Sequence, residues 1–513
     1  MTSSPTALPL TVLVTGATGY IGGRLVPRLL AEGHVVRAMT RDAGRLRDVP
    51  WAGQVQVVEA DALGTADSSP DPGPLDAALA GVDVAYYLIH SIGDGEEFEQ
   101  TDRLAAMAFG AAAKRAGVGR IVYLGGLVPA HEQLSPHLAS RAEVGQLLLD
   151  SGVPTAVLQA AVIVGSGSAS FEMLRYLTER LPAMVTPKWV NSRIQPIAVR
   201  DVLRYLVGVA TLPAEVSRRF DIGGPDVLTY LDMMKRYAVV AGLRKRLILP
   251  VPLLTPRLSG HWVNLVTPVP AALAKPLVRS LVNEVVCAED DIKTYLPDPP
   301  EGLLGFEDSA RLALRQVRQA TVETRWSSAS WPGAPSDPLP SDPAWAGGSL
   351  YEDLRQRQVD AEPQDLWRVI EGIGGEHGWY SFPLAWAVRG QVDRLFGGVG
   401  LGRGRRDPNE LLVGESLDFW RVEEIVDQQL LRLRAEMKLP GAAWLELGVE
   451  VEDGRTIFVQ RALFHPRGLA GHAYWWSVAP FHGIVFGGML ANIAGAAQRA
   501  AAERRDALPT MAP

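Results

Sequence analysis

Three glycines near the start of the chain have the spacing of a phosphate-binding turn. Gly16, Gly19 and Gly22 lie in VLVTGATGYIG, between an apolar run expected to be a strand and a pattern expected to be a helix. At such a junction the first glycine permits a tight turn, the second lets backbone approach a diphosphate, and the third lets helix pack on strand. The helix start adds free N–H groups and the positive end of its dipole. The motif predicts dinucleotide binding, with a merely structural turn as the alternative.

The second expected strand bears on which dinucleotide is bound. Thr40 and Arg41 lie at its tip, and Asp42 follows. A carboxylate here suits the ribose 2′-hydroxyl of NAD, whereas an arginine suits the 2′-phosphate of NADP. The pattern favours NADP(H) over NAD(H), with an exposed arginine beside Asp42 as the alternative. Asp61, after the third strand, is placed to reach the adenine or to cap the following turn. The predicted cofactor-binding residues are Thr15, Gly16, Thr18, Gly19, Tyr20, Ile21, Gly22, Arg41 and Asp61.

Apolar runs that alternate with helical patterns surround this motif. Strands are expected at 10–15, 34–40, 55–59, 82–90, 120–124 and 155–164, and helices at 20–32, 101–116, 141–151 and 309–319. Continuous apolar strands separated by helices indicate a parallel sheet that is covered on both faces. The sequence therefore predicts an α/β Rossmann domain, a doubly wound parallel sheet.

Several segments of this domain resemble a known superfamily. TGATGYIG, VRAMTR, GRIVYLGG, QPIAVRDVL and FDIGGPDVLTY are similar in order and spacing to short-chain dehydrogenases/reductases, above all to atypical, NmrA-like and extended members, which include sugar-nucleotide epimerases. The resemblance covers residues 10–243. Such enzymes generally use a Tyr-x-x-x-Lys pair, with a Ser or Thr after the fifth strand. Here the corresponding positions hold His137 and Arg141, and Gly125 and Gly126 stand where the hydroxyl is expected.

These replacements leave the chemistry open between two functions. A histidine can shuttle a proton and an arginine can hold the ribose, so His137 and Arg141 are the candidate catalytic pair of an atypical NAD(P)(H)-dependent oxidoreductase or epimerase. Alternatively, His137 is an exposed turn residue and Arg141 a surface cation. Tyr87 and His90, at the end of the fourth strand, are further acid/base candidates, with core packing or a loop position as the alternative. The second function is a non-catalytic NADP(H)-binding sensor or assembly protein, as in NmrA-like proteins.

A proline-rich stretch predicts the domain boundary. Residues 8–325 are expected to form the nucleotide-binding domain, with an elaboration over about 245–320, and residues 326–346 a semi-rigid linker. Beyond it, a short helix at 363–371 and strand-like runs at 415–422, 429–436, 443–451, 456–464 and 474–478 precede a helix at 481–503. Consecutive strands followed by one long helix indicate an α+β unit with a curved antiparallel sheet.

The second domain, residues 347–505, looks like a START/polyketide-cyclase-like domain of the helix-grip fold. The resembling stretches include GGEHGWY, VGESLDFWRVEE and FHPRGLAGHAYWWSVAPFHGIVFGGML, which are similar to an uncharacterised bacterial domain that follows such dehydrogenase-like domains. The resemblance implies a sheet wrapped around the closing helix and an apolar ligand cavity. Trp420, Trp444, Trp475 and Trp476 are expected to line that cavity or to form core.

Composition bounds the remaining functions. The net charge of −7 provides no general positive field, so nucleic acid is not expected as a partner, whereas an apolar small molecule is. The single cysteine, Cys287, is expected to be a buried structural thiol in a reducing, cytoplasmic compartment. No histidines have the spacing of a metal site. Residues 481–497 are shorter than the roughly 20 needed to span a bilayer, so a buried helix is expected rather than a transmembrane segment. The oligomeric state stays open.

Overall fold

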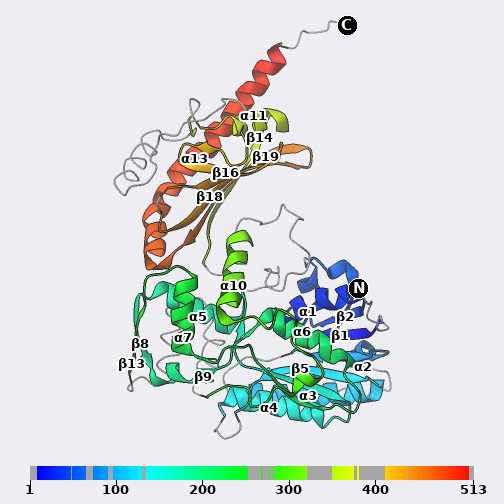
Figure 1. Ribbon diagram of the computed structural model, residues 1–513. Coiled ribbons are helices and arrows are strands. Elements are labelled where there is room, and N and C mark those ends of the chain that lie inside the picture. The colour runs from blue at the N-terminus through cyan, green and yellow to red at the C-terminus, as the bar shows by residue number, and fades with distance from the viewer. Residues whose placement is uncertain are drawn as a thin grey trace, which may run out of the picture. The chain divides into compact units, whose positions relative to one another are not determined.

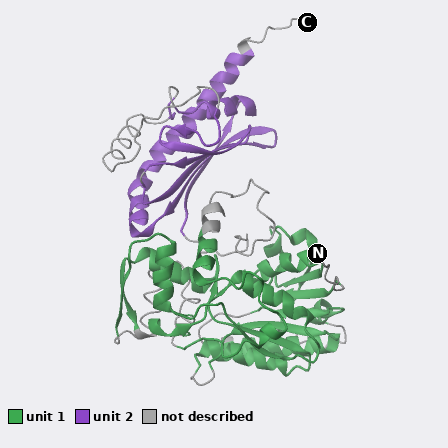
Figure 2. Ribbon diagram, in the orientation of Figure 1, with its two compact units in different colours: residues 1–348 green, residues 349–513 purple. Residues whose placement is uncertain are grey.

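The computed structural model divides into two compact units, residues 1–348 and 349–513 (Figure 2). It describes residues 9–47, 49–64, 73–89, 96–129, 134–251, 267, 277, 280, 283–320, 349–374, 378–380, 411–437 and 439–507. The expected linker, 326–346, lies outside the described residues. Each unit has hydrophobic cores of its own.

Unit 1 is built on a seven-stranded parallel sheet (Figure 1). The strand order is β11-β6-β5-β4-β1-β2-β3. The strands are β1 (Thr11–Thr15), β2 (Val35–Thr40), β3 (Gln56–Glu59), β4 (Val84–Tyr87), β5 (Arg120–Gly126), β6 (Thr155–Ala160) and β11 (Arg218–Ile222). The predicted doubly wound parallel sheet is confirmed, and β11 is a strand that the sequence pattern did not predict. The order reverses between β1 and β4, which is where open α/β sheets bind ligands.

Helices cover both faces of this sheet. Successive side chains of a strand point to opposite faces, so Val12 and Val14 belong to one core and Leu13 to the other. The first core includes α1 (Tyr20–Ala31) and α6 (Val199–Gly208), and the second includes α2 (Pro74–Leu79), α3 (Glu96–Ala116) and α4 (Pro136–Leu149). The parallel strands therefore end at one common edge between two helical layers.

A third core extends unit 1 beyond the ends of β5 and β6. It contains α5 (Ala169–Arg180), α7 (Tyr230–Val240) and α10 (Phe306–Ala320), with three short strand pairs. The pairs are β7 (Ile163–Val164) with β10 (Ile197–Ala198), β9 (Arg193–Ile194) with β12 (Leu228–Thr229), and β8 (Ala183–Pro187) with β13 (Leu247–Val251). The expected strand at 155–164 is thus two strands, β6 and β7.

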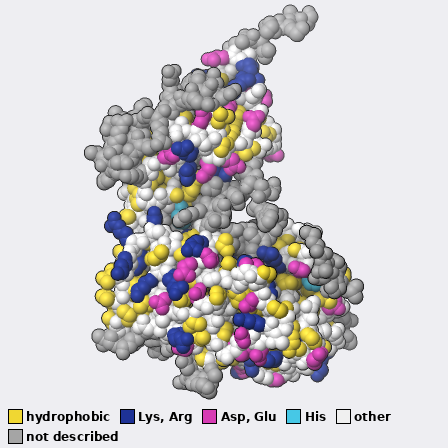
Figure 3. All heavy atoms as spheres, viewed as in Figure 1, with side chains coloured by type: hydrophobic (Ala, Val, Ile, Leu, Met, Phe, Trp, Pro, Cys, Tyr) yellow, Lys and Arg dark blue, Asp and Glu magenta, His cyan; other side chains and the backbone are white. Residues whose placement is uncertain are grey.

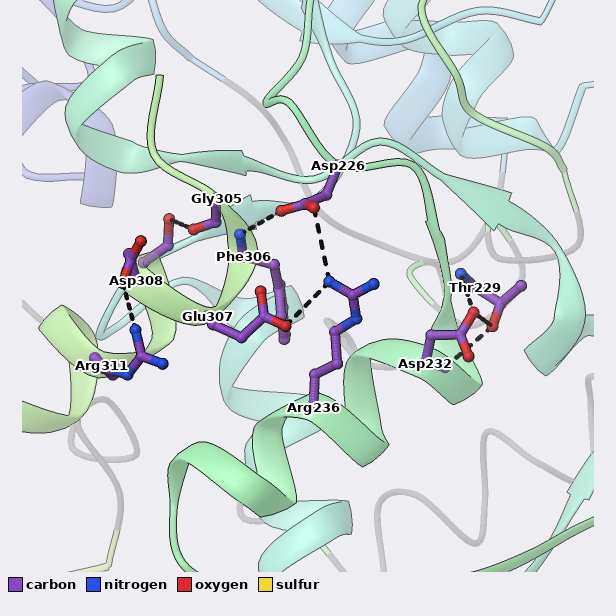
Figure 4. A network of polar contacts seen from close by, with 10 residues as sticks. Asp226, Thr229, Asp232, Arg236, Gly305, Phe306, Glu307, Asp308 and Arg311 are labelled. Carbon is purple, nitrogen blue, oxygen red and sulfur yellow. Dashed lines mark hydrogen bonds and ion pairs between the residues drawn. The ribbon is translucent and has the colours of Figure 1, made fainter. Parts of the chain in front are cut away.

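Polar contacts fasten α10 to α7 (Figure 4). The Arg236 guanidinium lies 3.0 Å from a Glu307 carboxylate oxygen and 3.6 Å from Asp226. Asp226 also accepts a 2.7 Å hydrogen bond from the Phe306 N–H, so it caps the start of α10. The Thr229 and Asp232 side chains form a capping box at the start of α7. These contacts fix the two helices that complete the third core.

Helix α5 carries a fully buried arginine. The Arg175 side chain has no exposed surface and lies 3.3 Å from Glu179 and 3.7 Å from Glu172. Glu172 accepts a 2.9 Å hydrogen bond from Gly167 N–H, and the Tyr237 hydroxyl of α7 donates to Glu179. Burial, reinforced by Glu179, raises the pKa of Tyr237 well above 10, so its phenol stays a proton donor. The cluster joins α5 to α7.

Replacing this arginine is expected to destabilise unit 1. In Arg175→Met two carboxylates would stay buried without their cation, so the free energy of unfolding should fall by about 3–5 kcal/mol. Urea unfolding followed by circular dichroism measures the loss. The control is Arg193→Met, whose side chain is 58% exposed and forms an ion pair with exposed Glu284; it should lose much less. Equal losses in the two variants would contradict the buried cluster.

Unit 2 is a six-stranded antiparallel sheet with helices on one face. The order is β14-β19-β18-β17-β16-β15. The strands are β14 (Tyr351–Val359), β15 (Ser416–Leu417), β16 (Trp420–Val426), β17 (Leu430–Ala435), β18 (Gly441–Glu452) and β19 (Arg455–Pro466), and the helices α11 (Pro363–Glu371) and α13 (Gly468–Ala507). The predicted antiparallel sheet is confirmed. Trp475 stacks between Tyr351 and Phe464, and Trp420 lies in the core.

Two sequence-based expectations for unit 2 are wrong. Residues 474–478 form no strand but belong to α13, because an apolar run without charges fits a strand and a helix equally well. The helix begins at Gly468, whose φ of +63° turns the chain after β19. Strand β14 was not predicted, because six of the nine residues in its sequence YEDLRQRQV are polar and four of these are charged. It is an edge strand held by pairing with β19 rather than by burial.

Helix α13 is less buried than expected. Within the part of the chain that the structure describes, it is the one helix long and apolar enough to cross a membrane, and 22% of its most apolar window is buried. Trp476 and Phe481 are 66% and 63% exposed, whereas Met489 and Ile493 are fully buried. Because core helices of soluble proteins pass the same test, this is only a weak indication of a span.

Candidate cofactor and substrate site

The glycine turn forms a cradle of bare backbone at the end of β1. Gly16 has a φ of +63°, and a Cβ there would lie 2.7 Å from the Leu88 carbonyl oxygen. A Cβ on Gly22 would lie 2.2 Å from the Gly16 carbonyl oxygen. Gly19 is the N-cap of α1, with extended backbone, and no side chain caps the helix. The start of α1 therefore fits a diphosphate, which would accept hydrogen bonds from backbone N–H groups there.

Two other residues of the predicted motif hold the turn in place. The Thr15 hydroxyl donates to the Tyr86 carbonyl and accepts from Leu88 N–H, both at 2.9 Å, so it ties β1 to β4. Tyr20 lies under the Arg24 guanidinium, 4.2 Å from the ring centroid, and its hydroxyl approaches Gly165. Both side chains therefore make contacts within the protein that stabilise the turn. Thr18 and Ile21 are half-buried within the turn.

The predicted selectivity residues lie at the ends of β2 and β3. Arg41 is exposed and forms no hydrogen bond or ion pair with another described residue. Asp42 accepts a 2.9 Å hydrogen bond from Gly44 N–H, so its carboxylate is engaged in the next turn. Asp61 likewise accepts a 2.9 Å hydrogen bond from Leu63 N–H, so its carboxylate caps the following turn, as one of its two predicted roles requires. Arg41 is thus available to a phosphate, whereas Asp61 is already used locally.

A pocket of about 240 Å³ opens where β5 and β6 end. His137 and Arg141 both line it, four residues apart and thus on the same face of α4. Apolar side chains form most of its walls, and serines supply further polar groups. Its lining comprises Gly126, Leu127, His137, Leu138, Arg141, Ala160, Ala161, Val162, Ile163, Ser168, Ala169, Ser170, Ile194, Leu277, Ser280 and Val285.

A glycine also brings α4 against the sheet. A Cβ on Gly126 would lie 2.9 Å from Leu138 Cδ2 and 3.6 Å from Arg141 Cδ. The glycine that stands where a hydroxyl was expected therefore makes room for the helix that carries Arg141. Ser135 caps that helix, its hydroxyl accepting from Leu138 N–H at 3.3 Å. His137 and Arg141 are half-buried pocket residues, not the exposed turn residue and surface cation of the alternative.

Sequence reasoning missed the far wall of the pocket. Ser168 and Ser170 lie at the start of α5, after β7, and Ile194 and Val285 come from segments far along the chain. The run GSGSAS between β7 and α5 was a signal, because glycines and serines after a strand favour a turn and a helix start. No local pattern indicates that residue 285 closes the same pocket.

Other candidates are not placed for chemistry. Tyr87 is 1% exposed and packs edge-on against Phe109 at 5.0 Å. Burial raises the pKa of Tyr87 far above 10, so its phenol stays protonated, and its packing is that of a core residue. His90 lies outside the described residues. Burial raises the pKa of Cys287 to about 12, which leaves little thiolate for nucleophilic attack. Within the described ranges no group of three His, Cys, Asp or Glu is placed to hold a metal ion.

The fold and the glycine cradle define an NAD(P)-binding Rossmann domain, and comparisons with known proteins agree. Residues 16–160 match the family model described as NAD(P)H-binding, and residues 345–489 match one described as a protein of unknown function, DUF2867. The chain is 29% identical to a ceramide reductase of Caulobacter vibrioides, over 53% of this chain and 84% of that protein. It is 27% identical to an NAD(P)H azoreductase of Xenophilus azovorans, over 45% and 74%.

A solved structure is similar at lower identity. The triphenylmethane reductase of Citrobacter sp. is 20% identical, with a TM-score of 0.47, over 60% of this chain and 99% of its own. The parallel sheet and the family-model match over residues 16–160 support an NAD(P)H-binding Rossmann domain in unit 1. The names of both curated relatives are those of reductases, and that of the azoreductase includes NAD(P)H.

Cofactor binding should be lost when a carboxylate occupies the start of α1. Asp is a good N-cap, so Gly19→Asp should leave the helix intact while its charge repels a diphosphate. We expect the dissociation constant for NADPH, measured by calorimetry, to rise by at least about tenfold, with little change in thermal unfolding.

The matched control is Gly53→Asp, because a Cβ on Gly53 meets no atom within 4 Å and its φ is not positive. This control should bind NADPH like the wild type. Unchanged affinity in Gly19→Asp would place the diphosphate elsewhere.

Proposed function

We propose that this protein is an NADPH-dependent reductase that reduces a carbonyl group of an apolar small molecule. The observation that carries the proposal is the apolar pocket in which His137 and Arg141 lie together, at the same edge of the sheet as the glycine cradle. The edge places β5 two strand spacings from β1, about 10 Å. The reductases among the relatives support this reaction class, and the ceramide reductase supports a lipid-like substrate.

The polar pocket residues His137 and Arg141 have different roles in the proposed carbonyl reduction. When bound, the cofactor supplies the hydride that the carbonyl carbon gains. His137 donates the proton that the carbonyl oxygen gains, so that a ketone becomes an alcohol. Arg141, whose Nε is buried without a hydrogen-bond partner among the described residues, holds the ribose or the oxygen through its positive charge. The apolar walls keep water away from the reacting carbon and bind the rest of the substrate.

The preference for NADPH rests on Arg41. Its exposed guanidinium at the end of β2 suits the 2′-phosphate, and neighbouring Asp42 is engaged in a turn. The proposal includes a cytoplasmic location, where NADPH is available and Cys287 stays reduced.

The second unit is proposed to be a START-like domain of the helix-grip fold that presents or retains the apolar substrate. In support, its elements run in the order strand β14, helix α11, strands β15 to β19 and closing helix α13. Both helices pack on the same face of the sheet. In this proposal the apolar ligand lies between α13 and the sheet within unit 2.

Turnover should depend on the His137 side chain. His137→Gln retains a hydrogen-bonding group but cannot transfer a proton, so kcat should fall by roughly 100-fold or more. The affinity for NADPH should be almost unchanged. The assay follows NADPH absorbance with a panel of ketones of increasing chain length.

Glu143→Gln is the control for this variant, because Glu143 lies on the same helix and faces Arg103 outside the pocket. Its turnover should equal that of the wild type. Full activity in His137→Gln would remove the assignment, and a wild type that binds NADPH yet never oxidises it would favour the sensor.

Selectivity between the cofactors should depend on Arg41. In Arg41→Ala the charge-assisted hydrogen bonds to the 2′-phosphate are lost, so binding of NADPH should weaken about tenfold. Binding of NADH, which lacks that phosphate, should not change and serves as the internal control. If both dissociation constants moved together or neither moved, Arg41 would not read the phosphate.

A further inference from the structure

The parallel pair of strands β8 and β13 presents an apolar face to solvent. Val185 pairs with Leu249, and Ala183 with Leu247. Side chains alternate along a strand, so Met184 and Ile248 point into the third core while their neighbours point outward. Val185, Leu247 and Leu249 are 50%, 57% and 51% exposed. An outward face of a two-stranded ribbon is ordinarily polar, so this face is an exposed apolar patch.

Positive charge accompanies this patch. Arg244 and Lys245 are exposed, and one residue separates Lys245 from Leu247, where β13 begins. That residue, Arg246, donates through Nε to the Thr178 carbonyl at 2.9 Å and so anchors the ribbon to the end of α5. In a chain of net charge −7, residues 233–283 contain no Asp or Glu but eight Lys and Arg. Among the described residues next to β13, the exposed side chains of Arg244 and Lys245 are both positive, whereas the whole protein is negative.

Apolar side chains beside cations match the surface of an anionic bilayer. The apolar groups enter the boundary between headgroups and acyl chains, and the cations pair with phosphates. In Figure 3, hydrophobic side chains gather at the edge of unit 1 where Figure 1 places β8 and β13, and Lys and Arg side chains lie beside them. Strands β8 and β13 contain no Asp or Glu, so a second copy of the same face would offer Arg244 and Lys245 no anionic partner, whereas an anionic bilayer does.

The ribbon and the pocket share structure. Helix α5 begins with residues that line the pocket and ends where Arg246 binds, a length of about 18 Å. Met184 and Ile248, on the inner face of the ribbon, belong to the same core as Leu138 and Val162 of the pocket wall. A bilayer on the outer face would therefore lie roughly the length of α5, about 18 Å, from the substrate site.

We propose that the outer face of the β8–β13 ribbon, together with Arg244 and Lys245, docks unit 1 on anionic lipid bilayers. Docking would bring the pocket to substrates that are dissolved in the membrane. The access of such substrates rests on the reductase function proposed above, whereas the docking does not.

Vesicle sedimentation tests the docking with the full chain. The probes are large unilamellar vesicles of phosphatidylcholine, alone or mixed with phosphatidylglycerol. The wild type should sediment with the mixed vesicles, less at high salt, and only weakly with neutral ones. Leu247→Ser/Leu249→Ser and Arg244→Glu/Lys245→Glu should each weaken binding roughly tenfold or more.

The matched control is Leu104→Ser/Met107→Ser on α3, where the two side chains are 49% and 53% exposed. It removes similar apolar surface elsewhere on unit 1 and should bind vesicles like the wild type. Thermal unfolding of all variants shows whether they fold, and turnover of a water-soluble ketone should be unchanged in each. That activity separates failure of docking from failure of the proposed reductase.

Three results would overturn the proposal. The wild type could fail to sediment with the vesicles that contain phosphatidylglycerol. The ribbon variants could sediment like the wild type, which would move binding to another surface such as α13. The wild type could instead form a dimer on size-exclusion chromatography that the ribbon variants convert to monomer, which would assign the ribbon to a second copy of the chain.

Discussion

The close approach of α1 to the end of β1 is the contact on which the site depends. At Gly22 a single added carbon would lie 2.2 Å from the Gly16 carbonyl oxygen, so helix and turn can meet only where side chains are missing. The Thr15 hydroxyl then fixes the turn against β4, at the point where the strand order reverses. A diphosphate bound there would allow the rest of a dinucleotide to lie along the common edge of the sheet, because all seven strands of this parallel sheet end on one side.

The substrate side follows the same principle. Because Gly126 has no side chain, α4 can lie against β5 without a clash at Leu138, and this brings Arg141 and His137 to the pocket. The opposite wall depends on α5, which is held by the buried cluster around Arg175 and by Arg246 from the ribbon. Few polar groups in an apolar pocket suit a molecule with one reactive oxygen and a long hydrocarbon part. In the proposed docking, the exposed apolar ribbon and its neighbouring cations would bring the pocket close to such a molecule in a bilayer.

The resemblance to a superfamily singled out His137 and Arg141, whereas local patterns in the sequence were sufficient for the parallel sheet and the glycine turn, because each of these depends on a few neighbouring residues. They could not show that Val285 and Ile194 close the pocket, since these contacts join distant segments. They predicted a strand at residues 474–478, which belong to α13, because a short apolar run without charges is compatible with a strand and with a helix. They also missed β14, whose charged residues are ordered by pairing with β19. The motif also did not indicate that the Thr15 hydroxyl joins β1 to β4 through hydrogen bonds.

The central claim is that one nicotinamide cofactor spans the glycine cradle and the pocket of His137 and Arg141. A crystal structure of the full chain with NADP⁺ tests it most directly. The account predicts the diphosphate on the backbone at the start of α1 and the nicotinamide ring beside Gly126, facing the apolar walls. A diphosphate bound elsewhere, or a nicotinamide ring turned away from this pocket, would contradict it.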